Sequence, residues 1–336
     1  MKKVWLLLAI IAMLVLAACG ADESSNDDGA ADEGNGADGG DSFLIGATQI
    51  VEHPSLDQAY KGFQEAIEEE GIQSEFDFQS AQNDQNNVKP ISDGFVADQV
   101  DLIFANSTPS ALGALQATSD IPIVFTSVTD AVDAGLVPSM DEAGENITGV
   151  VDLHPEQIDA TIEFLDEYFE DAKIGMIYNA GEQNSVNQVE AAEGAAEGTS
   201  LTVVERTVAN ASEVQQAAQS LSGEADVFYI ITDNTVVSAL ESVVGVAEEQ
   251  EIPLITGEPD SLEKGGFATF GIDYHTIGYR AGELAAEILT GEADVSELPA
   301  EYPPEIQLFI NEEAAEKQGV QWNEDWDESA ELIEVE

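Results

Sequence analysis

The sequence is short of cysteine and of positive charge: it has one cysteine, Cys19, and nine lysines and arginines among 336 residues. A single cysteine excludes a disulfide within the chain. The sequence has 68 acidic residues against these nine bases, which gives a formal net charge of −59. That charge would repel nucleic acid or any phosphate-rich partner. The sequence also has no Walker loop, no GxGxxG after a strand, no GxSxG elbow and no HExxH pair. These absences argue against an enzyme and against a bound cofactor.

The histidines and the many acids are the residues to weigh as metal ligands. His53, His154 and His275 lie far apart in the sequence, and their convergence on one ion is an open alternative, although single histidines in polar surroundings are commoner than ligands. The acids are scattered along predicted helix faces, at 65 and 68–70 for example, and are not gathered at metal-ligand spacing. We therefore predict no metal site and interpret the acids as a coat that keeps the protein soluble in concentrated salt, as in a halophilic or alkaliphilic source. The alternative is a surface that binds cations.

The N-terminal residues have the pattern of a secretory signal. Lys2 and Lys3 precede an apolar run over residues 4–16, which is too short to span a bilayer comfortably. The run ends in Leu-Ala-Ala-Cys at 16–19, which resembles a bacterial lipobox, whose cysteine is diacylated and becomes the new N-terminus. We therefore expect a lipoprotein signal peptide over residues 1–19 and a lipid on Cys19 that anchors the protein to the extracytoplasmic face of the cell membrane. The alternatives are a chance cysteine in an ordinary signal peptide and an uncleaved N-terminal anchor.

Residues 20–42 are predicted to form a disordered acidic tether. They contain eight acids, no base and no apolar residue larger than alanine. Such a segment cannot bury enough surface to offset the entropy of its chain, and self-repulsion extends it. We expect the folded body to begin at residue 43.

From residue 43 onward, short apolar runs alternate with amphipathic helical patterns. The runs are rich in β-branched residues, as expected for strands that are buried on both faces of a parallel sheet. Strand–helix alternation predicts right-handed βαβ units and hence an α/β fold with doubly wound, Rossmann-like sheets. The predicted strands are 43–48, 75–79, 102–105, 121–126, 174–178, 201–208, 227–231, 253–256 and 267–272.

The alternation occurs twice, and the two copies can be aligned by eye. The stretch 101–112 parallels 226–240, and each copy continues through a helix to an Ile-Pro pair and another strand, at 121–130 and at 252–260. Two similar α/β lobes in one chain predict an interface with a cleft between them. Chance similarity between apolar strands is the alternative, which the matched polar loop residues disfavour.

The segments that make the chain recognisable lie between residues 43 and 320. Their number and order show that it resembles the periplasmic-binding-protein-like family of ABC transporter substrate-binding lipoproteins, which includes tryptophan-binding members. The segments are IGATQIVEHPSLDQAYKGF (45–63), SAQNDQNN (80–87), VFTSVTDAVDAGLV (124–137), NITGVVD (146–152), IYNAGEQNSVNQVE (177–190), EVQQAAQSL (213–221), TDNTVVSALESVV (232–244) and TFGIDYHTIG (269–278).

This resemblance implies a type I binding-protein fold, in which a three-stranded hinge joins two lobes. The chain would cross near 149–152, near 271–274 and near 302–306. The N-terminal lobe would then comprise residues 43–150 and about 274–301, and the C-terminal lobe residues 151–273 and about 302–322. Residues 323–336 would form an acidic tail.

Ligands of open α/β sheets bind beyond the carboxyl ends of the strands, and in two facing lobes those ends meet across the cleft. His53, Asn106 and Glu258 are among the polar residues at the predicted strand ends. Capping of a helix is the alternative role for each serine, threonine, asparagine or aspartate at such a position. The candidate ligand-binding residues are Gln49, Thr108, Ser127, Thr129, Glu182, Asn184, Ser185, Asp233, Asn234, Thr235, Asp260, Asp273 and Tyr274.

The two predicted lobes differ in the charge that they offer to a ligand. The first has hydroxyls and helix N-termini at Thr108 and Thr129, which suit a carboxylate. The second has carboxylates, which suit an ammonium group through charge-assisted hydrogen bonds. We therefore predict a zwitterionic α-amino acid that bridges the lobes. The carboxylates are Glu182, Asp233, Glu258 and Asp260, with Asp273 at the hinge.

The family resemblance directs the ligand prediction to an aromatic amino acid, tryptophan first, with Tyr274 as the best residue for stacking on its ring. The GEQNS and GIDY stretches match the family's site segments and favour Glu182, Asn184 and Asp273 as contacts. We expect capture by hinge closure and delivery to the transmembrane subunits of an ABC permease. The alternatives are a nucleoside or a sugar in the same fold, and a ligand-sensing protein for a signalling receptor.

Overall fold

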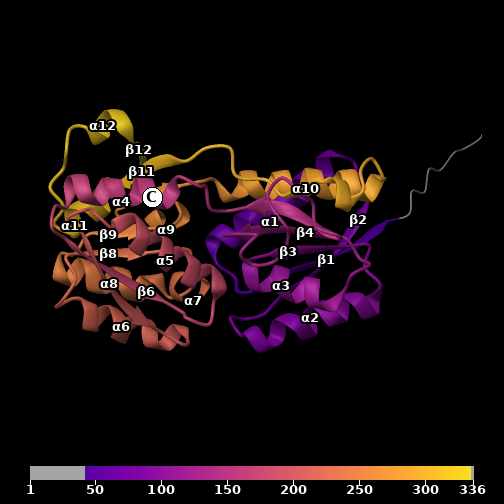
Figure 1. The fold of residues 1–336 in the computed structure, drawn as a ribbon, viewed down its shortest axis with the longest axis horizontal. Helices are drawn as coiled ribbons and strands as arrows, with labels where there is room; N and C mark the ends of the chain where they lie inside the picture. The colour runs from indigo at the N-terminus through magenta and orange to yellow at the C-terminus, as the bar shows by residue number, and fades with distance from the viewer. Residues whose placement is uncertain (1–41, 334–336) are drawn as a thin grey trace, which may run out of the picture. The chain divides into compact units, whose positions relative to one another are not determined.

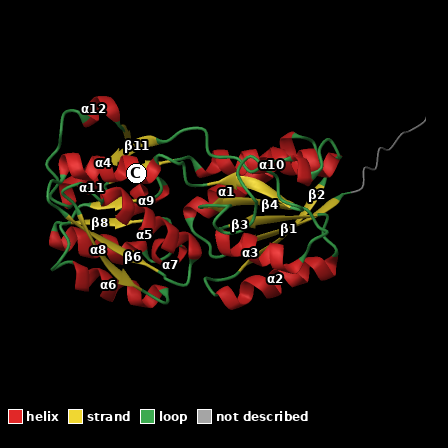
Figure 2. Cartoon of the chain, in the orientation of Figure 1, coloured by secondary structure: helices red, strands yellow, loops and turns green. Residues whose placement is uncertain are grey.

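The computed structural model describes residues 42–333. The predicted signal peptide, Cys19 and the predicted tether up to residue 41 lie outside this range, as do residues 334–336. The described chain forms two α/β lobes, each around its own sheet (Figure 1). Figure 2 shows helices on both faces of the strands in each lobe. The prediction of two doubly wound lobes is confirmed.

The N-terminal lobe contains a five-stranded parallel sheet in the order β2-β1-β3-β4-β5. Its strands send alternate side chains into two cores: Leu102 and Phe104 belong to one, Ile103 and Ala105 to the other. This alternation explains why the central strand is apolar and buried at nearly every position. The elements are β1 (Phe43–Gln49), α1 (Pro54–Glu69), β2 (Ser74–Ser80), α2 (Gln85–Asp98), β3 (Leu102–Asn106), α3 (Thr108–Ala117), β4 (Ile123–Val128), β5 (Ile147–Val151) and α10 (Tyr274–Thr290).

Helices α1 and α10 lie side by side on one face of this sheet, although more than 200 residues separate them in the sequence (Figure 1). Glycines allow their backbones to touch. A Cβ at Gly278 would stand 1.9 Å from the carbonyl oxygen of Ala59, and one at Gly62 would stand 2.1 Å from that of His275. This close approach fixes α10, and with it the position of Tyr274 at the start of the helix.

The C-terminal lobe contains a seven-stranded sheet in the order β12-β11-β10-β9-β8-β6-β7, in which β11 runs antiparallel to β10. Its helices α4 and α5 pack on one core and α6 and α8 on another. The strands are β6 (Lys173–Tyr178), β7 (Thr202–Thr207), β8 (Val227–Ile230), β9 (Leu254–Thr256), β10 (Ala268–Gly271), β11 (Gln307–Asn311) and β12 (Glu331–Ile333). The α-helices are α4 (Gln157–Tyr168), α5 (Gln183–Ala196), α6 (Val214–Leu221), α7 (Asn234–Val237), α8 (Leu240–Gln250), α9 (Asp260–Glu263), α11 (Glu312–Lys317) and α12 (Trp326–Ser329), and η1 (Ala211–Glu213) is a 3-10 helix. A second 3-10 helix, η2 (Val295–Glu297), packs on β5 of the N-terminal lobe.

The acidic segment from residue 323, which was predicted to be a separate tail, is integrated into the C-terminal lobe over its described residues. Trp326 is only 2% exposed, and its ring lies 5.4 Å from that of Phe267 and 5.2 Å from that of Tyr168. Beyond it, β12 adds a parallel strand at the edge of the sheet, next to β11. A single buried tryptophan therefore ties this acidic segment to the fold.

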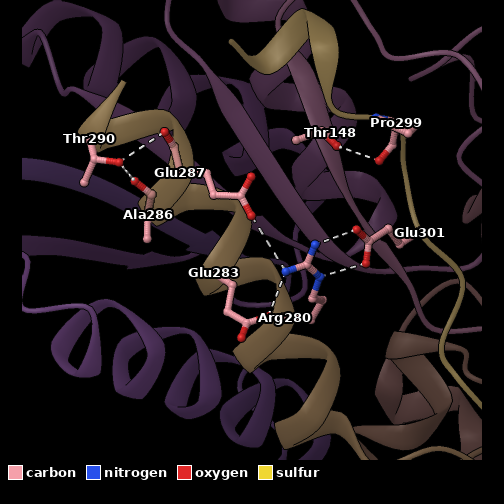
Figure 3. Close-up of polar contacts among 8 residues, drawn as sticks. All are labelled: Thr148, Arg280, Glu283, Ala286, Glu287, Thr290, Pro299 and Glu301. Atoms are coloured by element: carbon pink, nitrogen blue, oxygen red, sulfur yellow. Dashed lines mark hydrogen bonds and ion pairs between the residues drawn. The ribbon is translucent and has the colours of Figure 1, made fainter. Parts of the chain in front are cut away.

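The chain passes between the two sheets three times: after β5, between β10 and α10, and between α10 and β11. The third passage is held against the N-terminal lobe. Arg280 on α10 binds both carboxylate oxygens of Glu301 at 2.8 Å and also binds Glu283 at 2.8 Å, while Thr148 donates to the carbonyl oxygen of Pro299 at 3.3 Å (Figure 3). Such a bidentate pair fixes orientation as well as distance. The connecting segment thus enters the hinge from a defined point.

Candidate ligand-binding site

A cavity lies where the carboxyl ends of the strands of both sheets meet. Its empty volume is about 310 Å³ when space open to solvent is included, but only about 10 Å³ is wide enough for the centre of a water molecule. An amino acid therefore needs the lobes to part before it can enter. The lining residues are His53, Leu56, Ser127, Thr129 and Asp152 with Tyr274, and, from the second lobe, Asn184, Thr232, Asp233, Asn234, Val237 and Glu258.

Hydrogen bonds between the lobes surround this cavity. Ser55 donates to the carboxylate of Glu258 at 2.8 Å, and the amide nitrogen of Gln188 donates to the hydroxyl of Thr129 at 3.2 Å. Farther out, Gln183 donates to the carbonyl oxygen of Asp133 at 2.6 Å. The structure therefore represents the closed arrangement of the two lobes.

Three side chains of the cavity wall have a buried polar atom without a hydrogen-bond partner: His53 Nδ1, Asp152 Oδ1 and Asn184 Oδ1. Buried polar atoms are usually paired, and leaving one unpaired costs about 1–3 kcal/mol. A carboxylate oxygen and an amide oxygen only accept hydrogen bonds. The wall therefore presents acceptors to a molecule that brings donors.

Asp152 follows β5 at the hinge, and only one of its carboxylate oxygens accepts a hydrogen bond from another side chain. Its Oδ2 accepts a hydrogen bond of 2.7 Å from the hydroxyl of Tyr274, and its Oδ1 is free. Burial raises the pKa of Asp152 to about 6, and the charge of Glu258 also raises it, against the hydrogen bond from Tyr274. Ionised Asp152 is therefore costly in the empty closed cavity, and a cation beside Oδ1 would offset that cost.

The other acids near the cavity are occupied by protein donors. Glu182 accepts from the backbone and side chain of both Asn234 and Thr235, at 2.6–3.2 Å. Asp233 accepts from the backbone N–H groups of Asn179 and Val236, at 2.6 and 2.7 Å. Burial, and then repulsion from Glu182, raises the pKa of Asp233 to about 7. These two carboxylates build the loops of the second lobe and have little capacity left for a ligand.

Glu258 has a similar structural role at the interface between the lobes. It accepts from the hydroxyl of Ser55 and from both the backbone N–H and the hydroxyl of Ser261. Burial raises the pKa of Glu258 above its ordinary value, and burial followed by repulsion from Glu258 raises that of Asp260 to about 7. Among the three acids of the cavity wall within the described residues, Asp152, Asp233 and Glu258, only Asp152 therefore has a buried carboxylate oxygen without a hydrogen-bond partner.

The structure brings six of the thirteen sequence-predicted residues to the cavity wall. Gln49 and Ser185, which are fully buried, and Thr235 hold neighbouring side chains, and Thr108 and Glu182 line a separate groove between α3 and α5. Asp260 is half-buried at the start of α9, and Asp273 is exposed and caps α10 by accepting from Thr276 N at 2.6 Å. The six at the wall are Ser127, Thr129, Asn184, Asp233, Asn234 and Tyr274.

Four wall residues were not singled out from the sequence: Leu56, Asp152, Thr232 and Val237. His53 and Glu258 were noted at predicted strand ends, and Glu258 as a carboxylate for an ammonium group, but neither was among the thirteen candidates. Asp152 ends the NITGVVD segment, but 147–151 was not predicted as a strand, so no strand end pointed to it. Leu56 and Val237 have no polar signal at all.

No group of three or more histidine, cysteine, aspartate or glutamate side chains within residues 42–333 is arranged to hold a metal ion. His53 lines the cavity, His154 accepts from Glu156 N at 3.2 Å, and His275 is paired with Glu65 at 2.7 Å. Over the same range, no helix has the length and hydropathy needed to cross a membrane.

The chain belongs to the ABC transporter substrate-binding protein family, whose model matches residues 44–333. A tyrosine-binding protein from Clostridioides difficile (strain R20291) is 43% identical over 309 residues, which cover 90% of this chain and 88% of that protein. The architecture is the type I periplasmic-binding-protein fold, which solved structures share across the whole of their length. The family resemblance drawn from the sequence is confirmed.

Two solved relatives bear on the position of the lobes. A Streptococcus pneumoniae ABC domain in complex with L-Trp is 31% identical, with a TM-score of 0.82 over 87% of this chain and 100% of that one. A ligand-free, open substrate-binding protein with adhesive properties from Clostridium difficile is 39% identical, but its TM-score is only 0.64 over 88% of this chain and 100% of that one. The relative with the higher sequence identity superposes less well and is in an open form, which agrees with the closed arrangement of this chain.

Proposed function

We propose that this protein captures an aromatic L-amino acid in the closed cleft and delivers it to the transmembrane subunits of an ABC permease. The observation that carries the proposal is the unpartnered carboxylate oxygen of Asp152 in a cavity enclosed by both lobes. An α-ammonium group at that oxygen forms a charge-assisted hydrogen bond and neutralises a buried charge. The unpartnered amide oxygen of Asn184 accepts a second hydrogen bond from the ligand.

Two threonine hydroxyls on opposite lobes suit the ligand carboxylate. Thr129 and Thr232 both line the cavity, and both accept from the amide nitrogen of Gln188, at 3.2 and 2.7 Å. Since each hydroxyl already accepts there, its own proton is available to donate. A carboxylate between them ties the first lobe to the second, and this contact exists only in the closed form.

The apolar part of the ligand lies between Leu56 of the first lobe and Val237 of the second, the two aliphatic side chains of the wall. Their burial against a ring adds the hydrophobic part of the affinity. The relatives named for tyrosine and bound to tryptophan favour an aromatic ring at this place. We place tyrosine before tryptophan because the relative named for tyrosine has the higher identity.

The buried acids make closure depend on the ligand. Burial disfavours the ionised form of Asp152, so an ionised Asp152 in the closed and empty cavity costs free energy at neutral pH. The ligand's ammonium group offsets part of that cost in the closed state only. Shifting a population from 1:99 to 99:1 takes about 5.5 kcal/mol of such preference. The charge around Asp152 and the interlobe threonines together supply a preference of this kind.

A thermal-shift screen of the twenty amino acids, with sugars and nucleosides, tests the ligand class. In high salt, tyrosine or tryptophan at about 100 times its Kd is expected to raise the melting temperature by roughly 5 °C or more. Glutamate and glucose serve as the matched non-aromatic controls and should give no shift. A shift with a nucleoside or a sugar, and none with any amino acid, would overturn the proposal.

We further propose that a lipid on Cys19 holds the protein at the extracytoplasmic face of the membrane, with residues 20–42 as its tether. The Leu-Ala-Ala-Cys sequence supports this, together with the family's role in import. Expressed in a bacterium, the wild type should sediment with membranes, and Cys19→Ser should appear in the soluble extracytoplasmic fraction. Equal sedimentation of both forms contradicts the lipid anchor.

A further inference from the structure

His53 occupies a position where a side chain usually caps a helix, but it does not do so. It is the N-cap residue of α1, in extended backbone, and its side chain makes no capping hydrogen bond. The ring is instead a buried part of the cavity wall, 8% exposed. Its Nδ1 has no hydrogen-bond partner. The side chain of His53 therefore does not cap α1 but lines the cavity.

Burial and a nearby positive charge keep the His53 ring neutral. Burial, and then the charge of Lys264, lowers the pKa of His53 to about 3, so the ring is neutral and carries one N–H. A neutral imidazole carries its proton on one nitrogen and accepts with the other. With the proton on Nε2, the buried Nδ1 is an acceptor that has no hydrogen-bond partner among the described residues.

This acceptor lies next to the apolar part of the cavity. His53 and Leu56 are three residues apart at the start of α1, and Asn234 and Val237 are three residues apart on α7; all four line the cavity. Residues three apart at a helix share one face. His53 and Asn234 therefore line the cavity beside Leu56 and Val237, whose side chains hold the ligand ring in the proposed function.

We propose that His53 is a specificity residue, whose Nδ1 accepts a hydrogen bond from the donor on the ligand's side chain, the phenolic hydroxyl of tyrosine. This inference rests on the proposed function and adds the feature that separates tyrosine from phenylalanine. Phenylalanine fills the same space but leaves Nδ1 buried without a partner. Sites built to bond a substrate hydroxyl reject the analogue that lacks it much more strongly than apolar pockets reject an extra methylene.

Calorimetric titration of the full folded protein with tyrosine, phenylalanine and 4-aminophenylalanine tests the role of His53. The wild type is expected to bind tyrosine about 100-fold more tightly than phenylalanine. The 4-amino group also donates, so 4-aminophenylalanine should bind within about tenfold of tyrosine. Equal binding of tyrosine and phenylalanine by the wild type would overturn the inference without any variant.

His53→Phe keeps a flat ring and removes the acceptor, so the tyrosine preference should fall to within about tenfold, mainly through weaker tyrosine binding. His154→Phe, a residue outside the cavity wall, is the matched control and should keep the wild-type preference. If His53→Phe does not fold, His53→Gln retains an acceptor oxygen and should keep at least a tenfold preference. An unchanged preference in a folded His53→Phe overturns the inference, whereas failure of every aromatic amino acid to bind the wild type would instead overturn the proposed function.

Discussion

Asp152→Asn is expected to weaken tyrosine binding by about 100-fold or more, the largest effect of any single change at the cavity. The substitution keeps the size of the side chain and removes its negative charge. Removing one partner of a buried charge pair costs about 2–5 kcal/mol, and 100-fold corresponds to about 2.7 kcal/mol. The measurement is calorimetric titration of both proteins with tyrosine at pH 8, where Asp152, with a pKa of about 6, is ionised in the wild type.

The same substitution should leave the unliganded protein at least as stable as the wild type. Burial disfavours the ionised form of Asp152, and asparagine has no such form. The hydroxyl of Tyr274 can still donate to the amide oxygen. Asp159→Asn, at an exposed position in the first turn of α4, is the matched control and should bind tyrosine as the wild type does. Wild-type affinity in a folded Asp152→Asn would exclude Asp152 as the ammonium site.

Gly278→Ala is expected to destabilise the protein by about 3 kcal/mol and to lower its melting temperature by roughly 6 °C or more. The new methyl carbon would stand 1.9 Å from a backbone oxygen of α1, which has no rotamer through which to move away. Helices α1 and α10 would have to separate. Since Tyr274 is one turn before Gly278 on α10 and donates to Asp152, tyrosine affinity should fall as well.

Gly194→Ala is the matched control for this change. Gly194 is also inside a helix, α5, but a Cβ there would meet nothing within 4 Å. Alanine loses less conformational entropy than glycine on folding, so this substitution should stabilise the protein by about 0.5–1 kcal/mol. Thermal unfolding of the two variants beside the wild type should therefore give shifts of opposite sign. A Gly278→Ala protein that melts with the wild type would contradict the close packing of α1 and α10.

Much of the fold could be predicted from the sequence because both faces of each sheet are covered. Buried strands such as β3 and β8 then appear as short apolar runs between helical patterns. Three strands, β5, β11 and β12, were not predicted. The run at β5 is interrupted by Gly149, where a Cβ would stand 2.1 Å from the carbonyl oxygen of Phe125. β12 is an acidic edge strand of three residues, and its place in the fold depends on the burial of Trp326, which composition cannot show.

The candidate site was only partly predictable for a different reason. The strand-end rule locates the loops that meet at the cleft, but an aspartate or glutamate in such a loop can face the cavity or satisfy the backbone beside it. Glu182 and Asp233 satisfy the backbone, through hydrogen bonds from residues 179 and 234–236. Asp152 faces the cavity with an unpartnered oxygen because Tyr274, 122 residues away, binds only its other oxygen. Tertiary packing decides which carboxylate oxygens accept from the protein and which remain for a ligand, and this leaves no pattern in the sequence.

Titration of the wild-type protein with tyrosine and with 3-(4-hydroxyphenyl)propanoate, which lacks only the amino group, tests the role of the buried acids most directly. If the unpartnered carboxylate oxygen of Asp152 binds the ligand's ammonium group, tyrosine should bind, and the acid without the amino group should bind at least about 100-fold more weakly. Equal affinity for the two compounds would show that the negative cleft does not select the ammonium group, and would contradict the assignment of Asp152 as its partner.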